Sequence, residues 1–336
     1  MTIRIRRREF IATVGGAVAA WSLAARAQQS GGVRRIGVLA NSAATDATWQ
    51  SYLTTFVQEL RQLGWIEGQN IRIDIRWSAA DAALSRIYAA QLIGLTPDVI
   101  LASSTTNLTA IQQATSTVPV VFLQVSDPVE QGFVASITKP GGNLTGFSMY
   151  EFSVGGKWVD LLKEIAPNLG RVAVLSNPET SPQSKLFMRS VEAAAPSRGV
   201  RAIAIPVRAT TEIEAALQNF SREPNGGLIL PTDSFTRLRS KLIAELAERH
   251  RLPSISAYDG FAKDGGLMCY GSYINLPDHF RQAASYVHRI LKGEKPGDLP
   301  IQRSVKYTLR LNLKTAKALG LTVPLPLTGL ADEVIE

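Results

Sequence analysis

Short apolar runs alternate with longer amphipathic stretches along most of the chain. In the first half, the runs RRIGVLA, IRIDIRW, PDVILAS and VPVVFLQ are rich in β-branched residues and have the length of strands. Between them, TWQSYLTTFVQELRQLG, DAALSRIYAAQLIGL and TTNLTAIQQAT carry apolar residues at helical spacing. This alternation predicts a parallel sheet with helices on both faces.

The same alternation restarts after the turn-rich segment KPGGNLTG. The predicted strands of this second half are RVAVLSN, VRAIAIPV, GGLILPT and LPSISAY, and the predicted helices include KWVDLLKEIAP, SKLFMRSVEAAAPSRG and RLRSKLIAELAERH. The chain therefore contains two α/β units, although their sequences do not repeat. We expect two doubly wound parallel-sheet lobes.

The first 27 residues have the pattern of an export signal. Arg7 and Arg8 precede an uncharged run rich in Gly and Ala, which ends at Ala25-Arg26-Ala27 before Gln28. Because a membrane span needs about 20 apolar residues, we expect a cleaved signal and a periplasmic protein rather than the alternative, an uncleaved anchor. The paired arginines indicate the twin-arginine route, but Arg6 stands where Ser or Thr is usual, which leaves the general secretory route open.

Length and the end of the chain predict how the lobes are connected. The roughly 309 residues after the signal exceed one core and suggest two lobes. After a predicted helix from Asp278 to Leu291, the polar linker KGEKPGDLP and the segment VKYTLRLNLKTAKALGL indicate a return to the first lobe that bridges both. We expect 34–146 with about 277–310 in one lobe, and 147–276 with about 311–336 in the other. Several crossings between lobes would form a hinge.

Charge and cysteine content exclude some classes of function. Five arginines and one glutamate of the signal account for half of the formal net charge of +8. The other basic residues are interspersed with acids and form no basic stripe, so no nucleic-acid partner is expected. The single cysteine, Cys269, can form no internal disulfide and lies in the apolar run LMCY, which favours a buried hydrophobic role.

Small polar residues gather where the predicted strands end. In open parallel sheets, ligands bind at the carboxyl ends of the strands, beside helix N-termini. Two such rims facing each other would form a polar cleft. The candidate ligand-binding residues in these loops are Ser42, Ser103, Thr105, Thr106, Asp127, Asn177, Asp233, Tyr258 and Phe261.

Each candidate has a functional interpretation and a structural alternative. One helix cap needs one hydroxyl, so the run SSTTN from residue 103 leaves hydroxyls for an anion such as a carboxylate. Asp127 and Asp233 suit an ammonium group, and Tyr258 and Phe261 could stack on an apolar ligand group. The alternatives are N-capping for the polar residues and packing between the lobes for the aromatic ones.

Signatures of enzymes, metal sites and cofactor sites are absent from the sequence. There is no nucleophile elbow, phosphate loop, dinucleotide fingerprint or zinc-protease motif. His250, His279 and His288 have no second ligand at metal-binding spacing. We therefore expect no catalytic residue, metal or cofactor, and a protein that is not an enzyme.

Several segments resemble the bacterial ABC transporter substrate-binding protein family. They are RRREFIATVGGAVAAWSLAARAQQ, ELRQLGWIEGQNIRIDIRW, SDPVEQGFVASITKPGGNLTGFS, GGLMCYG, YVHRILKGEKPGDLPIQ, LNLKTAKALGLTVP and ADEVIE, which together cover the length of the chain. The resemblance implies a periplasmic binding protein of the type I fold, with two lobes joined by three crossings and a ligand cleft between them. It also implies a monomer that delivers a small-molecule solute to an inner-membrane ABC permease.

Relatives in this broad group resemble binders of amino acids, including aromatic ones. By that analogy, Ser103, Thr105 and Thr106 would receive the carboxylate, and Asp127 or Asp233 the ammonium group. The loops that would choose the solute, NSAATDAT, NPETS and PTDSF, are where such families vary.

Two other functions remain open on the sequence. A periplasmic ligand-sensing module for a receptor or kinase would share every cleft residue, and a periplasmic hydrolase is a more distant alternative. A cytoplasmic repressor of the same fold is disfavoured by the signal and by the lack of a helix-turn-helix before Arg34.

Overall fold

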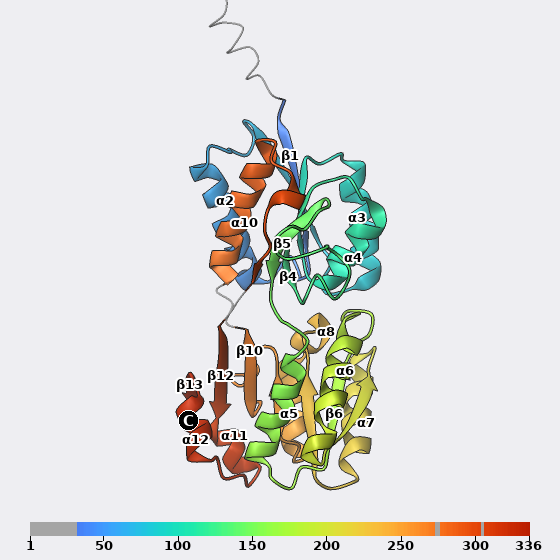
Figure 1. The fold of residues 1–336 in the computed structure, drawn as a ribbon, viewed down its shortest axis with the longest axis vertical. Helices are drawn as coiled ribbons and strands as arrows, with labels where there is room; N and C mark the ends of the chain where they lie inside the picture. The colour runs from blue at the N-terminus through green and yellow to red at the C-terminus, as the bar shows by residue number, and fades with distance from the viewer. Residues whose placement is uncertain (1–31, 273–275, 304–305) are drawn as a thin grey trace, which may run out of the picture.

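Six parallel strands form the sheet of the first lobe, in the spatial order β11-β5-β4-β3-β1-β2. The computed structural model describes residues 32–272, 276–303 and 306–336 (Figure 1), so the expected signal over residues 1–27 lies outside the described part. The strands of this sheet are β1 (Arg34–Ala40), β2 (Ile71–Trp77), β3 (Val99–Ser103), β4 (Val120–Val125), β5 (Leu144–Ser148) and β11 (Gln302–Arg303).

Helices cover both faces of this sheet. They are α2 (Ala47–Gln62), α3 (Ala82–Gly94), α4 (Thr105–Ala114) and α10 (Leu276–Leu291), with the short 3₁₀ turn η2 (Pro296–Asp298) before β11. Helices α2 and α10 lie side by side and share one apolar core, while α3 and α4 share the core on the opposite face (Figure 1). The central strands β3 and β4 are almost wholly buried, as continuous apolar runs in a parallel sheet predict.

The second lobe is built on a seven-stranded sheet in the order β13-β12-β10-β9-β8-β6-β7. Its strands are β6 (Arg171–Ser176), β7 (Arg201–Pro206), β8 (Gly226–Leu230), β9 (Ser254–Ser256), β10 (Met268–Ser272), β12 (Tyr307–Asn312) and β13 (Glu333–Ile335). All neighbours are parallel except β10 and β12, which are antiparallel. The two sheets therefore confirm the α/β fold of two parallel-sheet lobes, with one antiparallel pair that the sequence analysis did not predict.

The helices of the second lobe also divide between two faces. They are α5 (Val154–Ile165), α6 (Ser184–Ala194), α7 (Thr210–Ser221), α8 (Ser234–Arg237), α9 (Ser240–Arg249), α11 (Leu313–Ala318) and α12 (Leu325–Leu330), with the 3₁₀ turn η1 (Pro196–Arg198). Side chains of α5 and α6 belong to one core, and those of α7, α8 and α9 to another. Trp158 of α5 is fully buried and donates its indole N–H to the carbonyl of Tyr270 at 2.8 Å.

The chain passes between the lobes after β5, after β10 and after β11 (Figure 1). Because β12 pairs with β10, the last passage ends by Tyr307, a few residues before the boundary expected near residue 310. The segment YTLRLN thus runs in the second sheet rather than completing the first. Within the described ranges, no helix combines the length and the apolar character that crossing a membrane requires.

One glycine of the turn-rich segment KPGGNLTG, Gly146, is required by the packing of two strands. It lies in β5 opposite Phe122 of β4, with φ of +151°. A Cβ atom at this position would lie 2.1 Å from the Phe122 carbonyl oxygen. The close approach of two strand backbones therefore requires glycine here.

Candidate ligand-binding site

A cavity of about 550 Å³ lies between the two lobes. The first lobe contributes the ends of β1 and β4, the first turns of α2 and α4, and the start of α10. The second lobe contributes the loops after β6, β8 and β9, together with α8 and the end of β10. Its volume suits a small organic molecule. The carboxyl ends of both sheets face it, as expected for ligand binding to open parallel sheets.

Among the residues that the structure describes, three side-chain hydrogen bonds join the loops of the two rims directly. Thr106 Oγ1 donates to the carbonyl of Thr180 at 2.8 Å. Asn41 Nδ2 donates to Ser234 Oγ at 3.1 Å, and the hydroxyls of Ser126 and Thr232 lie 3.3 Å apart. The lobes are thus in contact around the cavity, and its two walls are held together.

Two cavity-lining residues have backbone angles that are rare for side chains other than glycine. Ser104, the N-cap of α4, has φ 75° and ψ 154°. Gln124 has φ 58° and lies where the register between β4 and β5 shifts. Strain of this kind costs on the order of 1–3 kcal/mol and is concentrated at functional sites. Both residues stand at strand ends, where they present polar groups to the cavity.

Asp233 lies in the cavity wall and caps α8. Its Oδ1 accepts hydrogen bonds from Thr180 Oγ1 at 2.5 Å and from the N–H of Phe235 at 2.9 Å, and its Oδ2 accepts one from the N–H of Asn177 at 2.8 Å. Burial raises the pKa of this carboxyl, and these hydrogen bonds offset part of the effect.

Unsatisfied polar groups are concentrated in this cavity. Among the described residues, eight buried side-chain polar atoms have no hydrogen-bond partner, and five of these belong to cavity-lining residues. The five atoms are Thr105 Oγ1, Gln124 Oε1, Gln183 Oε1, Arg237 Nη2 and Ser272 Oγ. A buried polar group without a partner costs about 1–3 kcal/mol, so the cavity favours a ligand that carries both hydrogen-bond donors and acceptors.

The orientation of Gln183 is set by the protein. Its Nε2 donates to the carbonyl and the hydroxyl of Thr232, at 3.0 and 3.2 Å, which leaves Oε1 as an acceptor. Thr105 has the opposite capacity, since its free hydroxyl can donate from the first turn of α4. The same cavity therefore holds a hydrogen-bond acceptor for a cationic ligand group and a hydrogen-bond donor for an anionic one.

Aromatic side chains line another part of the cavity. Trp49 and Tyr52 project from α2, and Tyr258 follows β9. Trp49 and Tyr52 both pack against Phe280 of α10, with ring centroids 5.4 and 5.5 Å apart, respectively. The first lobe thus holds a rigid aromatic wall, and the second lobe supplies a half-buried tyrosine.

Four charged residues line the cavity, and three of them are satisfied by the protein. Asp46 caps α2 and accepts the hydroxyl of Ser42, Asp233 is bonded as described above, and Asp259 lies 3.2 Å from the guanidinium of Arg310. Arg237, in α8, has no ion-pair partner among the residues that the structure describes. The guanidinium of Arg237 could therefore pair with a ligand group in the cavity.

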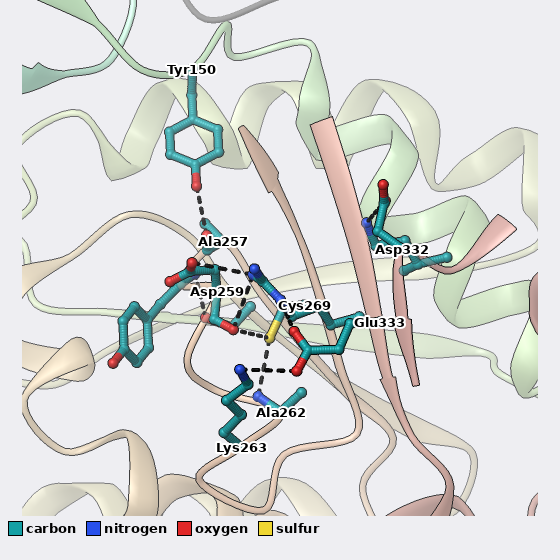
Figure 2. Close-up of polar contacts among 12 residues, drawn as sticks. Tyr150, Ala257, Asp259, Ala262, Lys263, Cys269, Asp332 and Glu333 are labelled. Carbon is teal, nitrogen blue, oxygen red and sulfur yellow. Dashed lines mark hydrogen bonds and ion pairs between the residues drawn. The ribbon is translucent and has the colours of Figure 1, made fainter. Parts of the chain in front are cut away.

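A polar network supports the loop that carries Tyr258 and Asp259 (Figure 2). Arg310 of β12 bonds to Asp259 and, at 2.7 Å, to Glu333 of β13, which also pairs with Lys263 at 2.9 Å. The thiol of Cys269 lies between the carbonyl of Asp259 and the N–H of Ala262, and burial raises its pKa to about 12. The thiol is thus a structural group, as expected from its apolar context.

The structure brings four of the nine candidate residues to the cavity. Thr105, Asp233, Tyr258 and Phe261 contribute to its wall, although Phe261 is fully buried and packs in the second-lobe core. Its ring fills the space beside Gly266, so stacking on a ligand is not its arrangement here.

The other five candidates make structural contacts instead. Ser42 bonds to Asp46, Ser103 accepts the N–H of Asn41, and Thr106 reaches across to the other lobe. Asn177 donates to Asp233, while Asp127 caps the following turn and lines a separate cavity of about 290 Å³ with Glu151 and Arg303. Their hydroxyl, amide and carboxylate groups are engaged in capping and in joining loops.

The candidate set missed many cavity residues that carry polar or aromatic groups. Among them are Trp49, Tyr52, Gln124, Gln183, Arg237 and Ser272. Most stand just beyond the loops that were considered, on a helix or strand end whose orientation the sequence does not show. The proximity of Arg237 to the PTDSF loop was the one available signal. Within the described ranges, no group of three or more His, Cys, Asp or Glu side chains could hold a metal ion.

Comparison with known proteins relates the whole fold to solute binding. The sequence model of the family described as ABC transporter substrate binding protein matches residues 38–335. A tyrosine-binding protein of Clostridioides difficile strain R20291 is 27% identical over 266 residues, which are 79% of this chain and 75% of that protein.

Two solved structures extend the likeness over the full fold. The ligand-free, open structure of a substrate-binding protein with adhesive properties from Clostridium difficile is 27% identical, with a TM-score of 0.61. A domain from Streptococcus pneumonia in complex with L-Trp is 23% identical, with a TM-score of 0.75. Each comparison covers 90% of this chain and 99% of the other.

Proposed function

The chain belongs to the ABC transporter substrate-binding protein family, with two parallel-sheet lobes of the type I periplasmic binding protein kind, and on that premise we propose that it binds an amino acid with an aromatic side chain. One observation carries the proposal: five of the eight buried, unpartnered polar side-chain atoms of the described residues lie in one interlobe cavity beside an aromatic wall. The tyrosine-binding relative and the L-Trp complex support this class of solute.

The zwitterionic part of the ligand binds where the rims meet. Its carboxylate lies at the N-terminus of α4, where the hydroxyl of Thr105 and the helix dipole favour an anion. Its ammonium group donates to Gln183 Oε1 and lies beside the carboxylate of Asp233. Its side chain lies between the α2 aromatics and Tyr258, which provide apolar and stacking contacts.

Binding stabilises the closed arrangement of the lobes. Thr105 belongs to the first lobe, whereas Gln183 and Asp233 belong to the second. A ligand that contacts both walls binds the closed form more tightly, so it shifts the population toward closure in proportion to that difference. No covalent step is involved.

The cellular role follows from the family and the N-terminal pattern. We propose that residues 1–27 are a cleaved signal of the twin-arginine kind, that the protein works in the periplasm, and that an inner-membrane ABC permease accepts its solute. The proposed role as a binding protein needs no catalytic residue, and the protein acts as a monomer.

The test uses protein recovered from the periplasmic fraction, whose first residue is expected to be Gln28. After bound solute is removed by unfolding and refolding, thermal shifts are recorded with L-tryptophan, L-tyrosine, L-phenylalanine, galactose and adenosine. Ligand at about 100 times its dissociation constant adds about 2.7 kcal/mol of stability, a readily detected shift. A shift with aromatic amino acids alone supports the proposal, whereas shifts only with galactose or adenosine contradict it.

Thr105→Val tests the site with little risk to folding. It removes a hydroxyl that the described protein leaves unpartnered, so the ligand-free stability should stay within about 0.5 kcal/mol while affinity falls roughly tenfold. Thr109→Val is the matched control, because Thr109 lies on the same helix and bonds only to the carbonyl of Thr105 among the described residues. Equal affinities of the two variants would remove Thr105 from the site.

A further inference from the structure

Arg237 is a charged cavity residue that the proposed contacts with the zwitterion leave unused. Its Nη2 atom is buried and has no hydrogen-bond partner within residues 32–272, 276–303 and 306–336. The three carboxylates that line the same cavity accept hydrogen bonds or an ion pair from the protein. Arg237 as a whole is half-buried, but its buried N–H group without a partner is costly, so an acceptor on the ligand would compensate it.

The charge of the Arg237 guanidinium influences the aromatic residues of the cavity. Burial raises the pKa values of Tyr52 and Tyr258, and nearby carboxylates, Asp259 foremost for Tyr52 and Asp264 for Tyr258, add to this effect. The charge of Arg237 opposes it on both phenols. Tyr52 belongs to the first lobe and Tyr258 to the second, so Arg237 lies within electrostatic range of both aromatic walls. The ligand side chain, rather than its zwitterionic end, occupies this part of the cavity in the proposed binding mode.

We infer that Arg237 selects amino acids whose aromatic side chain ends in a hydrogen-bond acceptor or a negative charge. This inference rests on the proposed function and narrows its ligand class. A phenol oxygen or a carboxylate at the far end of the ring accepts a charge-assisted hydrogen bond from the guanidinium. A plain phenyl ring of the same shape offers no acceptor to the buried, unpartnered N–H of Arg237.

The experiment compares ligands that differ only at the end of the ring. Isothermal titration of ligand-stripped protein uses L-tyrosine, 4-carboxy-L-phenylalanine and L-phenylalanine. Wild type is expected to prefer each of the first two over L-phenylalanine by about tenfold or more, the usual effect of a charge-assisted hydrogen bond. Arg237→Met keeps the apolar stem and removes the charge, so this preference should fall to within about threefold, while L-phenylalanine affinity changes little.

Arg239→Met is the matched control. Arg239 stands two residues further along the chain, stacks on Phe235 at 3.7 Å and bonds to Thr210, and it does not line the cavity. Its loss should leave the ligand preference intact.

Three outcomes overturn the inference in distinguishable ways. Equal losses for L-tyrosine and L-phenylalanine in Arg237→Met would place the α-carboxylate on Arg237 and leave amino-acid binding standing. Wild type without any preference would remove the selective role. Failure of wild type to bind any of the three would overturn the inference together with the proposed function.

Discussion

Asp233 shows how one residue serves both the fold and the cavity. Three protein donors hold its carboxylate before a solute arrives, and one of them, Thr180, belongs to the segment that Thr106 touches from the other lobe. Burial still raises its pKa, because hydration of the charge is lost. The positive charge of a ligand ammonium group would therefore stabilise the ionised form of this carboxylate.

We predict opposite pH trends for binding and for ligand-free stability at Asp233. Acidification protonates the carboxylate that the ammonium group needs, so affinity falls, and it falls from a higher pH than for an ordinary aspartate. The folded-state pKa lies above the unfolded value, so the folded state binds more protons between them. This residue's contribution to ligand-free stability therefore rises as pH falls through that interval.

The measurement is a difference between wild type and Asp233→Asn. Dissociation constants from titration calorimetry and unfolding free energies from urea melts are compared at a series of pH values between about 4 and 7. The variant lacks the titrating group, and both differences should change with pH in the stated directions. If the dissociation constants and the unfolding free energies of the two proteins changed with pH in the same way, the prediction would be contradicted.

At the scale of elements, the contact between β4 and β5 depends on one glycine. Gly146→Ala would place a methyl group on the backbone of Phe122 at a φ that alanine rarely adopts. We expect a loss of about 3 kcal/mol in the free energy of unfolding, the upper range for overpacking, measured by urea denaturation.

Gly142→Ala is the control for this substitution. A Cβ at Gly142 meets no other atom within 4 Å, and the residue lies in the same turn-rich segment. Its stability should stay within about 1 kcal/mol of wild type, because no backbone clash is created. Equal stabilities of the two variants would show that β4 and β5 can separate at little cost.

The elements were easier to predict from the sequence than their orientations. Runs such as VPVVFLQ and RVAVLSN predict buried strands because continuous apolar residues fit a sheet covered on both faces. The antiparallel direction of β12 was not visible, because it depends on where the preceding crossing enters the second sheet. Helix periodicity likewise did not show that the first turns of α2 carry Trp49 and Tyr52 into the cavity.

The candidate site was predicted in part for a related reason. Strand-end loops are rich in hydroxyl and amide groups, and several of the loops that the sequence singled out contribute residues to the cavity wall. It could not tell which groups the protein itself would use. Thr105 remains free and Thr106, its neighbour, spans the lobes. The side-chain directions at the N-terminus of α4 decide which of the two threonine hydroxyls stays free.

At the scale of the whole molecule, closure relies on few direct contacts between the rims. We predict that Thr106→Val weakens binding of the cognate amino acid about fivefold, because the closed form loses a hydrogen bond worth about 1 kcal/mol. Small-angle X-ray scattering of ligand-free protein should give a larger radius of gyration for this variant than for wild type.

Thr109→Val again provides the control, since its hydroxyl bonds within α4 and not across the cleft. It should leave both the affinity and the radius of gyration at their wild-type values. An unchanged affinity and radius for Thr106→Val would show that this cross-lobe bond contributes nothing to closure.

Helix α10 gives the molecule an unusual order of assembly. It follows most of the second lobe in the sequence, yet it lies against α2 (Figure 1). There Phe280 supports Trp49 and Tyr52. Strand β11 then adds the edge of the first sheet beside β5. The lobe that the ribosome begins first is therefore completed only after most of the second lobe has been made, from residues distant along the chain. A growing chain acquires the aromatic wall only when synthesis is nearly finished, so solute recognition begins with the whole protein.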